Sequence, residues 1–117
     1  MQWSFVLRAA LFAGMALAVL GAVSLAAPDD ATAKLFKARC SICHGVDGRG
    51  DTTAGKAAGV KDWTDGKTLK ALSDEQIEQT IRNGVKAPDG KDRMPPFPKL
   101  SDDQVKALRA HIRSLAH

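Results

Sequence analysis

Five consecutive residues constrain this chain more than any other stretch: Cys40, Ser41, Ile42, Cys43 and His44. They include the only two cysteines among the 117 residues. On a helical turn, positions i, i+3 and i+4 lie on one face, so the two thiols and the imidazole can point in the same direction. Any fold for this sequence must therefore accommodate all three groups on one side of a short helix.

The C-x-x-C-H pattern is typical of covalent attachment of a c-type haem. The two thiols would add across the two haem vinyl groups as thioethers, and His44 would be an axial ligand of the iron. Three alternatives lack the partners that they need. A structural zinc site needs four Cys or His ligands, a thioredoxin-like dithiol needs a βαβ context, and a disulfide across two residues closes too small a loop to add much stability. We therefore predict one covalent haem c on Cys40, Cys43 and His44.

Residues 1–27 differ in composition from the rest of the chain. Residues 9–27 carry no charge and are mostly Ala, Leu, Val and Gly. A basic start, an apolar centre and small residues before a cleavage point are typical of a secretory signal peptide, although the uncharged run is also close to the about 20 residues that span a bilayer. We favour a signal peptide over residues 1–27, with a retained membrane anchor as the alternative. Either way, the domain over residues 28–117 is expected outside the cytoplasm, in the periplasm.

The predicted domain is small, and chains of this size are marginally stable without a cofactor or a cross-link. Its only aromatic residues are Phe36, Trp63 and Phe97, so an apolar macrocycle would supply the centre of a sparse core. The formal charge is +4 for the whole chain, and Arg8 is the only charged residue of the first 27. This mildly basic balance, without a cluster of Lys and Arg among aromatics, excludes a nucleic-acid surface.

Local signals predict three helices. Residues 29–39, acidic at the start and basic at the end, form a helix that runs into the cysteine motif. Two capping boxes, each with serine at the N-cap and glutamine three residues on, start helices at Ser73 and Ser101. The first of these ends at Gly84, as a glycine end predicts.

The last helix has an apolar face with a 3.6-residue period, which indicates a helix packed on a core. We expect Arg109 and Arg113 on its opposite face. Residues 45–59 are rich in Gly, Asp and Thr without any hydrophobic period, and they are predicted as loop. A phosphate-binding loop is disfavoured there, because the G-x-x-x-x-G-K-[ST] pattern is missing. Trp63, which follows, is interpreted as a core aromatic whose indole N–H could donate to a haem propionate.

A further candidate ligand lies in the proline-rich segment 88–98. Met94 is the only methionine beyond the first 27 residues. A thioether is a soft ligand for haem iron, and a loop stiffened by prolines presents it at a small ordering cost. We predict Met94 as the second axial ligand, in preference to a role as a core filler. His111 and His117 are the competing candidates, and we disfavour both.

Four stretches follow one another along the predicted domain: Cys40-x-x-Cys43-His44-Gly45-x-Asp47-Gly48-x-Gly50, Ile81-x-x-Gly84, Met94-Pro95-Pro96-Phe97 and, in an amphipathic helix, Ile112-Arg113-Ser114-Leu115. Together they resemble the class I c-type cytochromes over essentially all of residues 28–117. The resemblance implies an all-α cytochrome c fold, with three to five helices around one haem and the first and last helices crossing. It also implies His44 and Met94 as the axial ligands.

The chain departs from that family pattern in three places. Thr32 stands where a glycine often permits close contact between the first and last helices, and His111 stands where an aromatic residue is common. The loop after His44 also lacks the proline whose carbonyl often receives the N–H of the ligand ring. Some other carbonyl must therefore fix this imidazole.

The family works as one-electron carriers between redox proteins, so the resemblance implies an electron carrier and not an enzyme. Basic residues near a haem edge, among Lys37, Lys91, Arg93 and Lys99, could steer an acidic partner. Two alternatives remain open. One is a haem peroxidase or small-ligand-binding protein with a labile sixth ligand. The other is a membrane-anchored relay subunit of an oxidase or dehydrogenase.

Overall fold

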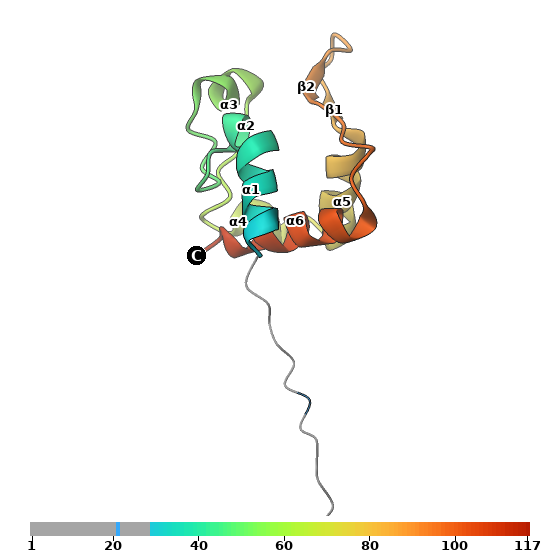
Figure 1. Cartoon of the computed structure of the whole chain (residues 1–117). Helices are drawn as coiled ribbons and strands as arrows, with labels where there is room; N and C mark the ends of the chain where they lie inside the picture. The colour runs from blue at the N-terminus through green and yellow to red at the C-terminus, as the bar shows by residue number, and fades with distance from the viewer. Residues whose placement is uncertain (1–20, 22–28) are drawn as a thin grey trace, which may run out of the picture.

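A computed structural model of the protein describes Gly21 and residues 29–117 (Figure 1). The predicted signal segment, residues 1–27, otherwise lies outside the described residues and stays a prediction. In chain order the elements are α1 (Asp30–Arg39), α2 (Ser41–His44), α3 (Thr53–Ala58), α4 (Lys67–Lys70), α5 (Asp74–Asn83), β1 (Val85–Lys86), β2 (Asp92–Met94) and α6 (Asp102–Ser114). The described part is mainly helical with one small sheet, which confirms the predicted all-α class. The two single-turn helices α2 and α4 bring the helices of this part to six, more than the three to five expected.

Helix α1 forms and ends as its sequence predicts. The carboxylate of Asp29 caps its start by accepting a hydrogen bond of 2.8 Å from the N–H of Thr32, which satisfies one of the free amides of the first turn. The chain turns at Cys40 and continues directly into α2. The cysteine motif therefore lies at the end of a nearly continuous helical segment.

The two predicted capping boxes are both present. At each, the serine hydroxyl accepts from the amide three residues on, and the glutamine side chain accepts from the serine amide. Helix α5 ends before Gly84, as predicted. An added Cβ at Gly84 would collide with the backbone carbonyl of Met94 and would lie 2.8 Å from the nitrogen of Pro96. The absence of a side chain here lets the methionine segment pack directly on the end of α5.

Helices α1 and α6 contact each other, and Figure 1 shows α1 standing across α6. At this crossing the ring of Phe36 lies 4.6 Å from the ring of His111, at a tilt of 52°. His111 therefore occupies the place of the aromatic partner that the family pattern expects. Thr32, in place of the usual glycine, is accommodated with only 7% of its surface exposed.

The core is built by side chains from four helices, α1, α4, α5 and α6. Its buried apolar members are Phe36, Leu69, Ile77, Ile81, Val105, Leu108 and Ile112. The predicted apolar face of α6 supplies three of them. None of these buried apolar residues belongs to α2, α3 or the two strands, so other contacts must hold those elements.

The arginines of α6, expected on the face opposite the apolar one, both form ion pairs with α5. Arg113 donates to the carbonyls of Leu69 and Leu72 and pairs with Asp74 at 2.8 Å. Arg109 pairs with Glu78 at 2.9 Å. Both guanidiniums reach acidic residues of α5, because α5 and α6 contact each other. Arg113 also reaches α4 and the turn between α4 and α5.

The prediction of loop throughout residues 45–59 was wrong for α3. The hydroxyl of Thr52 caps this helix by accepting from the N–H of Gly55 at 2.8 Å. The same hydroxyl donates to the carbonyl of Ile42 at 2.7 Å. A capped turn of small residues can thus form without an amphipathic face, because its packing partner is the backbone of α2.

Part of the segment 88–98, predicted as a loop stiffened by prolines, forms a short antiparallel sheet with residues 85–86. Val85 pairs with Met94, and Lys86 pairs with Asp92, with an irregularity between the two pairs. This hairpin projects from the end of α5 on the side of the molecule opposite α3 (Figure 1). Among the described residues, no helix combines the length and apolar character needed to cross a bilayer.

Candidate functional site

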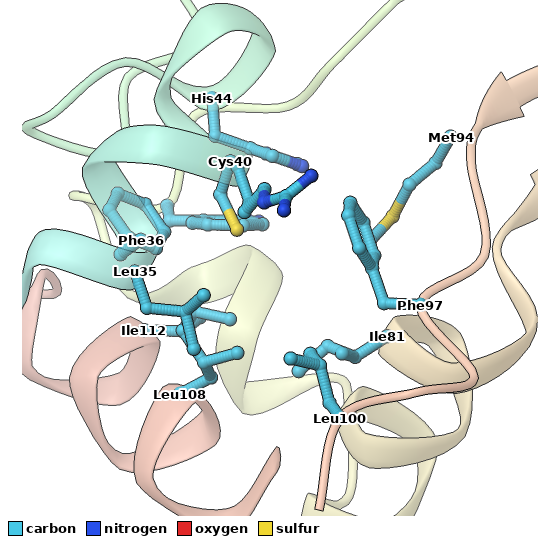
Figure 2. Close-up of a pocket in the computed structure, with 12 residues that line it drawn as sticks. Leu35, Phe36, Cys40, His44, Ile81, Met94, Phe97, Leu100, Leu108 and Ile112 are labelled. Carbon is cyan, nitrogen blue, oxygen red and sulfur yellow. The ribbon is translucent and has the colours of Figure 1, made fainter. Parts of the chain in front are cut away.

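An open, largely apolar cavity of about 580 Å³ lies between the α1–α3 half and the α5–hairpin half of the molecule. Its lining includes Cys40, Cys43, His44 and Met94, together with Trp63. Figure 2 shows His44 and Cys40 on one side, facing Met94 and Phe97 on the other, above a floor of aliphatic side chains. All five residues singled out from the sequence therefore line one cavity.

The imidazole of His44 is half-buried at the cavity wall. Burial lowers the pKa of His44 to about 4, so the ring is neutral at neutral pH and keeps a lone pair for a metal. Its Nδ1 atom is buried and has no hydrogen-bond partner among the described residues. The expected carbonyl for this ring is therefore not provided by the part of the protein that the structure describes.

Trp63 packs against the core, as predicted, and also contacts His44. Its indole stacks on the imidazole of His44, with ring centroids 4.1 Å apart and planes inclined by 18°. The backbone N–H of Trp63 donates to the carbonyl of Gly48 at 3.0 Å, which anchors the backbone next to the ring. The structure thus identifies an aromatic neighbour that limits the rotation of His44, and the propionate contact stays a prediction.

The two thiols are free and partly buried. Burial raises the pKa of the Cys40 thiol to about 11, so this group is protonated at neutral pH. The backbone that carries both cysteines is fixed from α3, because Thr52 donates to the carbonyl of Cys43. The N–H of Gly50 also donates to the carbonyl of His44 at 2.8 Å. The glycine-rich loop therefore serves to hold the motif in place.

Met94 reaches the cavity from the end of β2. Its backbone is fixed on two sides, since Val85 pairs with it in the hairpin and Gly84 lies beneath its carbonyl. Three residues on, the N–H of Phe97 donates to the carbonyl of Ile81 at 3.1 Å. The thioether is thus carried by a segment anchored to α5, as the stiff loop of the prediction requires.

The two other histidines lie away from this lining. His111 packs on Phe36 at the helix crossing, and the backbone N–H of His117 donates to the carbonyl of Thr64 at 3.0 Å. Within residues 29–117, no three His, Cys, Asp or Glu side chains come together as a metal ligand set. Met94, unlike either of these histidines, lines the same cavity as His44.

Comparison with known proteins settles the family. The profile of the cytochrome c family matches residues 30–116. The chain belongs to the cytochrome c family. Members of this family carry a covalently bound c-type haem and use it for electron transfer, so these properties extend to the present cytochrome.

Two relatives illustrate the range of this family. The solved structure of the KustC0563 c-type cytochrome is 34% identical, with a TM-score of 0.63, over 74% of this chain and 98% of that protein. FixP, a subunit of the cbb3-type cytochrome c oxidase of Azorhizobium caulinodans, is 35% identical over 99 residues. That match covers 80% of this cytochrome and 31% of FixP, so the chain spans about a third of its curated relative.

The residues present fit a c-type haem. The cavity volume falls within the roughly 300–1,000 Å³ typical of cofactor sites. Two thiols at the required spacing, a neutral imidazole and a thioether all line it, and most of its wall is apolar. Cys40, Cys43, His44 and Met94 are therefore the side chains of this cytochrome that would hold the cofactor.

The charged residues around the cavity differ from those expected for partner docking. Its charged lining residues are Arg39, Lys61 and Arg93, all basic. Of the four cations predicted, only Arg93 is among them, and its guanidinium is engaged by the carbonyl of Ala58. Arg39 could have been found from its position directly before Cys40, whereas Lys61 is brought to the rim only by the fold.

Proposed function

We propose that this cytochrome is a one-electron carrier whose single haem c is bonded to Cys40 and Cys43 and ligated by His44 and Met94. The observation that carries the proposal is the convergence of these four side chains on one apolar cavity, although Met94 is separated from His44 by fifty positions in the chain. When bound, haem supplies an iron centre that cycles between ferric and ferrous states, and a methionine ligand raises its reduction potential.

The protein's own residues support transfer of an electron alone. His44 is neutral, and Trp63 packs along its ring, so the imidazole is held ready in one orientation. Met94 occupies the opposite wall, which would leave no axial position for a substrate. The apolar lining, which includes Ile81 and Phe97, would limit the access of water to a bound macrocycle. This arrangement supports a carrier, and we propose that the protein is not an enzyme.

The test is an optical spectrum of the exported protein beside that of a Met94→Leu variant. Leucine nearly conserves the volume of methionine, so the packing of the cavity wall should be retained while the thioether is removed. We expect the parent to be low-spin, with a sulfur-to-iron charge-transfer band that the variant loses. A high-spin parent that readily binds small ligands would instead indicate a haem peroxidase or ligand-binding protein with a labile sixth ligand.

We further propose that the partners are redox proteins with an acidic docking face, met in the periplasm after export. The support is the wholly basic set of charges at the cavity rim: Arg39, Lys61 and Arg93. Charge complementarity accelerates encounter, and added salt screens it. The second-order rate of electron transfer to an acidic partner should therefore fall as ionic strength rises. A rate independent of salt would contradict this docking mode.

A second candidate function is a relay subunit within an oxidase complex. Similarity to a segment of FixP, named as an oxidase subunit, favours it. A relay would be held in a complex or by a retained N-terminal segment, whereas a diffusing carrier would be released with the periplasmic fraction. Fractionation of cells that express the full chain, followed by haem staining, separates the two.

A further inference from the structure

Arg93, directly before Met94, makes a contact that crosses the cavity. Its Nε and Nη2 atoms donate to the backbone carbonyl of Ala58 at 3.1 and 2.8 Å. The two residues are 35 positions apart in the sequence, and both line the cavity. Gly59 leaves room for the guanidinium, because an added Cβ there would lie 3.1 Å from Nη2. The contact is thus a two-donor bridge from the hairpin to the opposite wall.

The accepting carbonyl suits this bridge. Ala58 is the last residue of α3, and carbonyls of a last turn have no partner within their helix. The cap amide of Gly59 goes instead to the carbonyls of Gly55 and Lys56. Helix α3 is in turn tied to α2, through Thr52. The bridge therefore connects the segment of Met94 with the half of the molecule that carries His44.

The other hydrogen bonds of the methionine segment do not cross the cavity. Within residues 29–117, those of residues 85–98 other than Arg93 remain inside the hairpin, reach α5, as the bond from Phe97 to Ile81 does, or join Phe97 to Leu100 in the turn before α6. Lys86 and Lys91 pair with Asp92 and Asp89 of the same hairpin. Without Arg93, the hairpin would be held on one side only.

We propose that Arg93 is a positioning residue that latches the hairpin to α3, keeps Met94 at the iron and so limits access of external ligands to that axial position. The inference rests on the proposed function, since it takes Met94 as the ligand. An opened latch would let the hairpin move away from α3, and an external base could then replace the thioether.

The experiment measures imidazole binding to the ferric holoprotein, because imidazole is a good ligand for iron and can enter only where Met94 leaves. Arg93→Gln removes the charged fork. The variant loses two hydrogen bonds from a charged donor, and the free energy of these bonds is reduced because the guanidinium is exposed to solvent. We therefore expect the affinity for imidazole to rise about three- to tenfold and the charge-transfer band to weaken. Lys91→Gln is the matched control, since it removes a cation of the same hairpin that is 85% exposed and makes no contact with α3.

Salt distinguishes the latch from a general effect of charge. A hydrogen bond to a backbone carbonyl is local, so the difference between Arg93→Gln and parent should persist in 1 M salt, where the screening length is about 3 Å. An unchanged imidazole affinity in Arg93→Gln would overturn the latch, and so would a difference that disappears in 1 M salt or is matched by Lys91→Gln.

Failure of the latch and failure of the proposed function give different results. If the parent lacks the sulfur-to-iron band, Met94 is not the ligand and both proposals fall. If the parent has the band, and Arg93→Gln behaves as the parent does, only the latch is refuted. Circular dichroism of the variants checks that the helices are retained, which we expect because Arg93 is exposed.

Discussion

Replacing Gly84 with alanine tests whether the end of α5 sets the position of the methionine ligand. The residue has φ of 69° and ψ of −169°, a region of backbone conformation that is occupied almost only by glycine and costs other residues about 1–3 kcal/mol. The new Cβ would also collide with the carbonyl of Met94 and lie 2.9 Å from the carbonyl carbon of Pro95. These neighbours are backbone atoms, so the methionine segment itself must shift.

The shift adds an overpacking cost of about 1–3 kcal/mol. The total loss, about 2–6 kcal/mol, is a large fraction of the stability of about 5–15 kcal/mol that is usual for a domain. Because the displaced atoms belong to the segment of Met94, the sulfur-to-iron band should weaken together with stability. Denaturant unfolding of the holoprotein measures the first effect, and the near-infrared absorbance of the ferric protein measures the second.

Gly90 provides a matched control. It also has a positive φ, of 84°, but an added Cβ there meets no atom within 4 Å. Gly90→Ala should therefore cost only the backbone strain, about 1–2 kcal/mol, and leave the band unchanged. If Gly84→Ala and Gly90→Ala lose the same stability and keep the same band, the contact beneath Met94 does not position the ligand, and the reasoning is wrong.

Three further predictions concern His111, Trp63 and Arg113, whose contacts were not fully predicted from the sequence. Burial lowers the pKa of His111, so below about pH 6.5 the unfolded chain takes up a proton that the folded chain resists, and stability falls on acidification. The His111→Phe variant should thus lose less stability than the parent between pH 7 and pH 5, and parallel pH profiles would contradict this. Trp63→Leu should alter the electron paramagnetic resonance of the ferric haem by freeing the His44 ring, while Trp63→Phe should restore the parental spectrum; identical spectra for all three would rule out an orienting role. Arg113→Met should lower the free energy of unfolding by about 2 kcal/mol, whereas Lys56→Met, at an exposed pair, should leave the melting temperature unchanged.

The accurate sequence predictions rest on local signals. Both capping boxes and the glycine end of α5 were identified because each involves groups three or four residues apart. The same holds for Cys40, Cys43 and His44, whose spacing alone brings them to one face. Helix α3 was missed because it has no apolar period, and its stability comes from Thr52 and from contact with α2.

The site shows the same division between local and distant contacts. The chemistry of each candidate ligand was readable from its residue type, and Met94 was singled out by its softness and its stiff neighbours. The stacking of Trp63 on His44 and the bond from Arg93 to Ala58 were not predicted. Neither leaves a pattern in the chain, because an indole or a guanidinium fits many environments.

The sequence by itself determined which groups can hold the cofactor and where most helices begin and end, because those properties depend on residue type and on neighbours within one turn. Only the tertiary structure decided which groups face one another across the cavity, what holds the ring of His44, and what ties the hairpin of Met94 to the opposite wall. These groups lie 19 to 50 positions apart in the chain, and their partners are selected by the packing of α1, α5 and α6 as a whole.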